Sequence, residues 1–262
     1  MSDHEPELLA LIHREIARSG PLTFARFMDL ALYAPGLGYY MRDAGRIGAQ
    51  GDYYTSGNLH PLFGETVARQ LDEMAALAGP GFTVIEQGAG RGALAYDVLR
   101  ATSSEGSDGP WPYLIVERSP AMVERQRQVL APWAASGRVS WIEAFPNQPV
   151  NGCIVSNELV DAFPVHRVVQ RDGALQEVYV AAAEAGVAEI LGPPSTSELA
   201  AYLDRLGVTL AEGQYAEINL AAIEWMRAVG RAIDRGFAIT IDYGHPAEEL
   251  YGPHRPRGTL FA

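Results

Sequence analysis

The chain has 262 residues, of which 48% are hydrophobic and 20% are charged, and its formal net charge is −12. This length allows one large domain or a domain with appended elements, and the acidic balance argues against a general nucleic-acid-binding protein, which needs a basic surface. The single cysteine, Cys153, excludes an internal disulfide and a cysteine-based metal cluster.

Helices and a glycine-rich loop are predicted in the first part of the chain. Residues 5–18 have the apolar spacing of a helix, which a Ser-Gly-Pro sequence ends. Thr23 is expected to cap a second, short helix that continues to about Leu32. A glycine-rich loop follows at 45–57, and residues 61–78 predict a longer helix.

The middle of the chain alternates strand and helix patterns, as expected for a doubly wound parallel α/β sheet. Apolar runs predict buried strands at 82–86, 113–117, 138–142, 152–156 and 237–242. Helical spacing predicts helices at 93–101, 120–130, 196–206 and 219–235. The last strand is nearly continuous in apolar residues, so we expect it to be buried on both faces.

Residues 165–192 interrupt this alternation. Apolar and polar positions alternate there on both sides of Asp172-Gly173, which is a hairpin signal. We therefore expect an inserted element on the substrate side of the sheet, at about 165–216.

The most informative segment is the turn after the 82–86 strand, Glu86-Gln-Gly-Ala-Gly-Arg-Gly92. Glycines at a strand-to-helix turn let the backbone fold sharply and approach a ligand. A dinucleotide site presents backbone amides to a pyrophosphate, which a carboxylate would repel. S-adenosylmethionine (SAM) instead carries an ammonium and a sulfonium. Glu86 therefore favours a SAM site.

A second carboxylate, Glu117, is predicted at the end of the 113–117 strand, 27 residues after Gly90. In nucleotide-binding sheets this position offers a carboxylate to ribose hydroxyls, in SAM and NAD sites alike. Arg118 could bind a 2′-phosphate, so an NADP-dependent oxidoreductase stays an alternative. The chain has no lysine, and hence no Tyr-Lys pair for hydride transfer.

Carboxylates also follow the fourth strand, at the sheet edge where ligands of open α/β sheets bind. If a helix starts there, Glu158 and Asp161 are three residues apart and share a face. They would then hold a cationic or amine substrate in line with the sulfonium methyl group and take up its proton. The alternative is that Asp161 caps a helix and Glu158 is only solvated. His166 is a further candidate base, although a histidine at a strand start is more often structural.

Seven ordered segments resemble the MidA-like SAM-dependent methyltransferases, and the resemblance covers essentially the whole chain. They are Gly20–Met28, Tyr33–Tyr40, Gly51–Ser56, Phe63–Glu65, Glu86–Gly92, Ser156–His166 and Ile241–Gly244. The family includes the mitochondrial complex I assembly factor that dimethylates an arginine of a complex I subunit.

The resemblance also implies roles for individual residues. The methionine end of SAM would be lined by Glu86, Gly88, Gly90 and Gly92, with Arg91 in the same loop assigned to the cofactor. Glu117 would bind the ribose, and Thr55 and Ser56 would belong to a loop that closes over the cofactor. Asn157 and Glu158 would lie where arginine methyltransferases place carboxylates against the guanidinium.

The chain departs from the family pattern after the fifth strand. A SAM-binding sheet usually continues with further strands, but only 20 residues follow Asp242, and prolines interrupt them. We therefore expect those C-terminal strands to be missing. An uncovered strand edge is avoided in sheet proteins, so we expect a homodimer that covers it or a weakly stable, poorly active chain.

Together these observations predict a class I SAM methyltransferase, a Rossmann-like doubly wound sheet. An N-terminal helical cap and cofactor-covering loop would occupy 1–80, and the SAM-binding core 81–262. The substrate would be an arginine side chain of a partner protein, with Glu158 as the main catalytic residue and Asp161 in support. No metal is needed, because the sulfonium is already activated and catalysis is mainly alignment. A non-catalytic SAM-binding assembly factor is the alternative.

The sequence also carries expectations about location and source. No apolar run is long enough to span a membrane, and the acidic N-terminus lacks the features of a signal or transit peptide. We therefore expect a cytoplasmic protein that binds neither nucleic acid nor membrane. All basic residues are arginine, which we interpret as the codon bias of a GC-rich bacterial genome.

Overall fold

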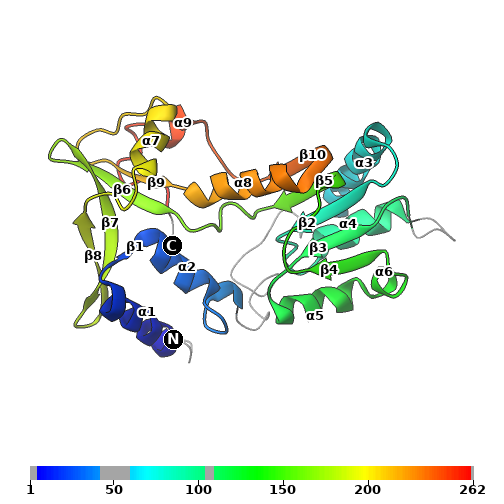
Figure 1. Cartoon of the computed structure of the whole chain (residues 1–262), viewed down its shortest axis with the longest axis horizontal. Helices are drawn as coiled ribbons and strands as arrows, with labels where there is room; N and C mark the ends of the chain where they lie inside the picture. The colour runs from blue at the N-terminus through cyan, green and yellow to red at the C-terminus, as the bar shows by residue number, and fades with distance from the viewer. Residues whose placement is uncertain (1–4, 42–59, 104–108, 261–262) are drawn as a thin grey trace. The chain divides into compact units, whose positions relative to one another are not determined.

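The computed structural model of the chain describes residues 5–41, 60–103 and 109–260 (Figure 1). The chain divides into two units, and each has its own sheet. Unit 1 comprises Met1–Arg42, Phe163–Glu224 and Tyr243–Ala262, and unit 2 comprises Asp43–Ala162 and Trp225–Asp242. The predicted boundary at residue 80 differs from this division, because the segment 61–78 packs on the sheet of unit 2.

Unit 2 contains a five-stranded parallel sheet in the order β10-β5-β2-β3-β4. Its strands are β2 (Thr83–Gln87), β3 (Tyr113–Val116), β4 (Val139–Ile142), β5 (Val150–Asn157) and β10 (Ile233–Ile241). From the central β2 the chain winds outward to β3 and β4, then returns to β5 on the other side of β2. The predicted doubly wound α/β sheet is confirmed, with its topological switch point between β2 and β5.

The helices of unit 2 connect these strands. They are α3 (Pro61–Ala78), α4 (Ala93–Thr102), α5 (Pro120–Val129), α6 (Ala131–Ala135) and the last part of α8 (Leu220–Ala232). Apolar residues of α3 and α4, such as Leu71 and Leu99, are fully buried in one cluster with Val84 and Tyr113 of the sheet. Both helices therefore cover the same face of the sheet.

Helices α3 and α4 approach closely at Gly64. A Cβ atom added at Gly64 would lie 2.3 Å from the Cβ atom of Asp97. Only a residue without a side chain fits at this crossing, because Cβ atoms are fixed to the backbone and cannot move aside.

Unit 1 is built around an antiparallel sheet of β1 (Leu22–Thr23), β6 (His166–Arg171), β7 (Ala174–Ala183), β8 (Gly186–Gly192) and β9 (Tyr215–Ile218). The predicted hairpin is confirmed: β6 and β7 are joined at Asp172 and Gly173, whose φ angles are 54° and 74°. Strand β9 and the pairing of β1 with β7 were not predicted. The helical elements are α1 (Glu5–Ser19), α2 (Phe24–Tyr33), η1 (Tyr39–Met41), α7 (Glu198–Arg205) and α9 (Ala247–Leu250), with the first part of α8.

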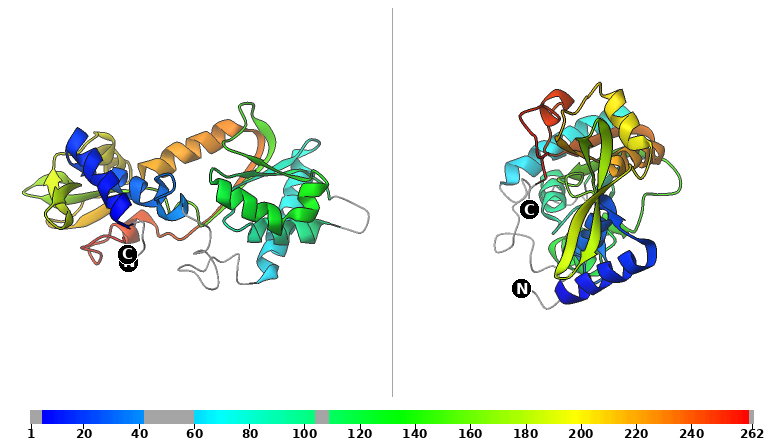
Figure 2. Two further views of the ribbon diagram at one scale, coloured as in Figure 1. Left: turned by 90° about the horizontal axis from the view of Figure 1, so that it is seen from below. Right: turned by 90° about the vertical axis from the view of Figure 1, so that its left-hand side faces the viewer.

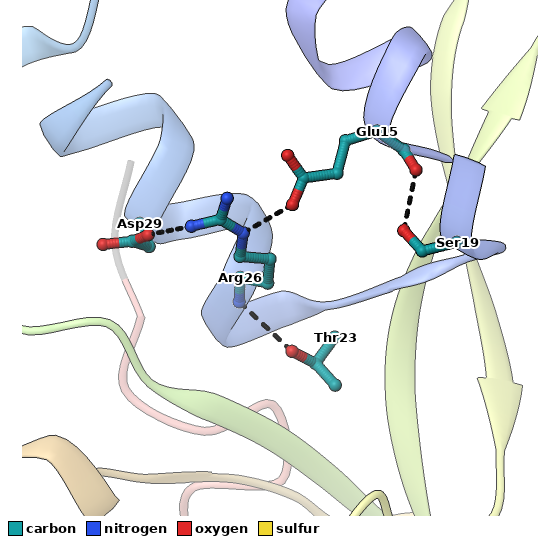
Figure 3. Close-up of polar contacts among 5 residues, drawn as sticks. All are labelled: Glu15, Ser19, Thr23, Arg26 and Asp29. Carbon is teal, nitrogen blue, oxygen red and sulfur yellow. Dashed lines mark hydrogen bonds and ion pairs between the residues drawn. The ribbon is translucent and has the colours of Figure 1, made fainter. Parts of the chain in front are cut away.

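The N-terminal helices begin and end close to where the sequence predicts. The Thr23 side chain accepts a hydrogen bond from Arg26 N and so caps α2, as expected (Figure 3). Arg26 also binds Glu15 of α1 and Asp29 of α2, which joins the two helices. Figure 2 shows both helices, in blue, beside the yellow-green strands β7 and β8, where Val187 packs against Ile12 and Leu22.

The C-terminal part of the described chain, residues 251–259, forms hydrogen bonds with side chains next to and in β9 of unit 1. The Gln214 side chain donates hydrogen bonds to the carbonyl oxygens of Tyr251 and Gly252. The Glu217 carboxylate of β9 accepts hydrogen bonds from the backbone N–H and the hydroxyl of Thr259. Residues far apart in the sequence therefore share one small core, which includes Val168, Ile218 and Tyr251.

Strand β10 differs from its prediction. It lies at one end of the described sheet, and only alternate residues (Phe237, Ile239 and Ile241) pack against the core, while Ala238 and Thr240 are exposed. The expectation that both faces are buried was wrong, because one face of this terminal strand stays uncovered by described residues. Within the described ranges, none of the helices has the length and apolar character needed to cross a membrane.

We predict opposite effects for two helical glycines of unit 2. Gly64→Ala should lower the free energy of unfolding by about 1–3 kcal/mol, because its methyl group would overlap Asp97. Gly230→Ala on the exposed side of α8 meets no atom within 4 Å, and should raise it by about 0.5–1 kcal/mol through helix propensity. Chemical denaturation measures both, and equal effects of the two substitutions would contradict the close helix crossing.

Candidate functional site

The glycine-rich turn links β2 to α4. Gly88, Gly90 and Gly92 all have positive φ angles, of 77°, 52° and 83°, which explains why glycine occupies these positions. Gly92 is the N-cap of α4 and offers no side chain to the first amides of the helix. Such amides are available to a ligand.

Two of these glycines have different surroundings. A Cβ atom at Gly88 would lie 2.9 Å from Cδ1 of Leu159, so the glycine turn packs against the segment that follows β5. A Cβ atom at Gly90 would meet no atom of the described residues within 4 Å. The turn is therefore closed by protein at Gly88 and open at Gly90. Next to it, partial burial and the neighbouring Arg125 lower the pKa of Arg91.

Glu86 is buried, with 2% of its surface exposed, and its Oε2 accepts a hydrogen bond of 2.7 Å from the Tyr113 hydroxyl. Burial raises the pKa of Glu86 to about 7, although the hydrogen bond acts in the opposite direction. An ordinary glutamate would carry a fixed negative charge at neutral pH. In the fold the charge of Glu86 instead depends on pH close to neutrality.

Glu117 lies where it was predicted, directly after β3. Its Oε1 accepts hydrogen bonds from the backbone N–H groups of Arg118 (2.9 Å) and Ser119 (2.8 Å). Its Oε2 accepts a hydrogen bond of 3.2 Å from Nε2 of Gln126 on α5. The carboxylate is thus held in one orientation at the carboxyl edge of the sheet.

The segment after β5 is an irregular turn, so no helix begins at Glu158, and the condition under which Glu158 and Asp161 would share a helical face is not met. Glu158 has a φ of 48°, and its N–H donates to the carbonyl oxygen of Ile241. The Oδ2 atom of Asp242, directly after β10, accepts hydrogen bonds from the N–H groups of Val160 (2.8 Å) and Asp161 (3.3 Å). The Asp242 side chain therefore satisfies the amides of this turn, which in a helix start would need a capping group.

Three carboxylates nevertheless gather at this edge. The Asp161 side chain reaches the surface, but partial burial and then the neighbouring Asp242 and Glu158 raise its pKa to about 6. Asp242 was not among the site residues predicted from the sequence. Its signal was available, because Asp242 is the last residue of the fifth predicted strand, at the edge where ligands bind.

The remaining predicted residues fall into three groups. Asn157 is the last residue of β5 and is in register with Ile241 of β10. His166 belongs to unit 1, on β6, where its Nδ1 lies 2.7 Å from Oε1 of the fully buried Glu177. Thr55 and Ser56 lie outside the described residues. Among the residues that the structure describes, no group of three or more His, Cys, Asp or Glu side chains is arranged to hold a metal ion.

The chain is similar in sequence to a known protein family and to several curated proteins. Residues 62–262 match the family described as "Putative S-adenosyl-L-methionine-dependent methyltransferase". The chain is 28% identical to the mitochondrial protein arginine methyltransferase NDUFAF7 homolog of Drosophila melanogaster, over 91% of this chain. It is 26% identical to the Caenorhabditis elegans homolog, over 88% of this chain. It spans 60% of the length of each of these relatives.

A solved structure is similar over nearly the whole chain. It is the crystal structure of a COG1565 superfamily member from Burkholderia thailandensis bound to S-adenosyl-homocysteine. The sequence identity is 35%, the TM-score is 0.88, and the match covers 98% of this chain and 67% of that one.

We predict that Glu86 makes unit 2 less stable as the pH rises toward neutrality. Because its pKa is raised from 4.5 to about 7, the folded state keeps a proton that the unfolded chain releases between these values. The free energy of unfolding therefore falls as the pH rises through this window. Glu86→Gln should remove this contribution, which chemical denaturation at about pH 4.5 and about pH 7.5 measures.

Glu73→Gln, at an exposed position of α3, is the matched control for the loss of one carboxyl group. If the wild type, Glu86→Gln and Glu73→Gln all show the same pH dependence, Glu86 does not titrate in this range.

Proposed function

Since the chain belongs to the family of S-adenosyl-L-methionine-dependent methyltransferases, we propose that unit 2 binds SAM and that the protein methylates an arginine side chain of a partner protein. Membership confirms the family that the motifs predict. The match to a structure bound to S-adenosyl-homocysteine is the observation that carries the proposal. The named arginine methyltransferases among the relatives support arginine as the substrate.

The residues of unit 2 fit this cofactor. The glycine turn is open at Gly90, and the fixed carboxylate of Glu117 suits the hydroxyl donors of a ribose. The buried Glu86 and the carboxylates of Glu158, Asp161 and Asp242 suit a cofactor with positive charges. When bound, SAM supplies a methyl group that its sulfonium charge already activates.

Glu158 is proposed to hold the substrate guanidinium. Arginine stays protonated at neutral pH, and a carboxylate can accept two parallel hydrogen bonds from its planar group. Such pairing fixes which nitrogen faces the methyl donor, so alignment supplies much of the rate. The strained backbone of Glu158 is held by Ile241 and by the turn that Asp242 caps, which fixes the position of this residue at the sheet edge.

The methylated nitrogen must lose a proton, and Asp161 is proposed to assist Glu158 in accepting it. With a pKa raised to about 6, Asp161 is ionised at neutral pH yet more basic than an ordinary aspartate. A role for His166 as a further base stays a prediction, because this residue belongs to unit 1. Cofactor roles stay predictions for Arg91, Asn157, Thr55 and Ser56. The sequence-based expectations of a homodimer, a cytoplasmic location, a bacterial source and no nucleic-acid or membrane partners also stay predictions.

The first test concerns the cofactor. Gly90→Val places a branched side chain in the open part of the glycine turn, so it should abolish SAM binding measured by isothermal titration calorimetry. Gly137→Val is the matched control, because Gly137 has a φ of 79° and also meets no atom within 4 Å. Unchanged SAM affinity in folded Gly90→Val protein would contradict the assignment of this turn.

The second test concerns the carboxylate. Glu158→Gln should leave SAM affinity within a few fold but reduce transfer of a labelled methyl group to arginine-containing proteins by about 10²-fold or more. Glu143→Gln is the control, since Glu143 follows β4 at the same edge of the sheet and is exposed. Equal turnover in the two variants would exclude a chemical role for Glu158.

A further inference from the structure

Gln126 on α5 is an uncharged polar side chain with no exposed surface. Burial of an amide costs free energy unless its donors and acceptor are all hydrogen-bonded. Gln126 meets this condition in full: Oε1 accepts from Nε1 of Trp141 (2.8 Å), and Nε2 donates to the carbonyl oxygen of Gly90 (2.8 Å) and to Oε2 of Glu117 (3.2 Å).

The orientation of this amide is determined by Trp141. An indole N–H can only donate, so the oxygen of Gln126 must face Trp141 and its NH₂ group must face Gly90 and Glu117. Trp141 is itself held in place, because the guanidinium of Arg127 lies 5.2 Å from the centre of its ring. One side chain thus joins the glycine turn after β2 to the carboxylate after β3.

Among the described residues, the hydrogen bonds to Glu117 leave part of the accepting capacity of Oε2 unused. Each carboxylate oxygen can accept about two hydrogen bonds. Oε1 accepts two from the backbone of Arg118 and Ser119, while Oε2 accepts one from Gln126. The remaining capacity of Oε2 points to a single place for a ligand hydroxyl.

We propose that Gln126 is a positioning residue for the ribose of SAM. It acts through Glu117, whose second oxygen it holds ready for a ribose hydroxyl, and through Gly90, whose carbonyl it keeps turned toward α5. This inference rests on the proposed function. Without Gln126, Oε2 would lose its hydrogen bond while Oε1 keeps its two backbone bonds, and the glycine turn and the carboxylate would no longer be joined by one side chain.

The test compares two ligands on matched variants. The ligands are S-adenosyl-homocysteine and its 2′,3′-dideoxy counterpart, which lacks the ribose hydroxyls, and calorimetry gives both dissociation constants. Gln126→Leu removes the amide at similar volume. Gln128→Leu is the control, because Gln128 lies on the same helix, is exposed and likewise binds a glutamate, Glu124.

Wild type and Gln128→Leu should both prefer the ribose ligand. Gln126→Leu should bind that ligand about tenfold more weakly, the scale of a hydrogen bond to a charged group, and should lose most of the preference. Its affinity for the dideoxy ligand should change little. A thermodynamic cycle of this kind isolates the coupling between Gln126 and the hydroxyls.

If Gln126→Leu weakens the binding of both ligands equally, or still prefers the ribose ligand as the wild type does, the inference about Gln126 is wrong. The proposal that the protein binds SAM would not be affected by that result. A wild-type protein that binds neither ligand would instead overturn the proposed function, and this inference with it.

A second variant covers the case in which Gln126→Leu does not fold. Trp141→Phe removes the N–H that orients the amide but keeps Gln126, and should lose part of the same preference. Trp133→Phe is its control, because that indole donates to Ser103 instead. A full preference in folded Trp141→Phe would count against the inference.

Discussion

The candidate site depends on the parallel pairing of β2 with β5. These strands are neighbours although β3 and β4 separate them in the sequence, so the segments that follow them meet at one edge of the sheet. Their approach is close: a Cβ atom at Gly152 of β5 would lie 1.9 Å from the carbonyl oxygen of Thr83 at the start of β2. The same strand register determines that Gly88 and Leu159 are in contact, so the glycine turn packs against the segment that follows β5.

Local signals in the sequence predicted much of this fold. The Thr23 cap, the 61–78 helix, the five parallel strands and the Asp172-Gly173 hairpin each follow from patterns within a few residues, and the structure confirms them. Glu117 was also placed at its strand end, because strand length and spacing determine that position.

Other features depend on contacts between residues that are distant in the chain, so no local sequence pattern predicts them. A helix start was considered at 158–161, but the side chain of Asp242, directly after β10, caps the amides of this turn. Strand β9 of unit 1 is short, and its partner strand β6 lies more than 40 residues earlier. The burial of Glu86 against Tyr113 depends on which face of β2 the helices cover, which a glycine motif does not specify.

The arrangement of the units along the chain has a consequence for biosynthesis. The last residue of unit 2 is Asp242, whereas two hydrogen bonds to the Glu217 carboxylate of unit 1 come from Thr259. During translation, the five described strands of the unit 2 sheet are therefore made before the segment of unit 1 around Thr259. Since compact units fold as their residues become available, the sheet that carries the glycine turn can form while β6, β7 and β9 still await the segment around Tyr251. A ribosome that pauses after Asp242 would favour assembly of unit 2 first.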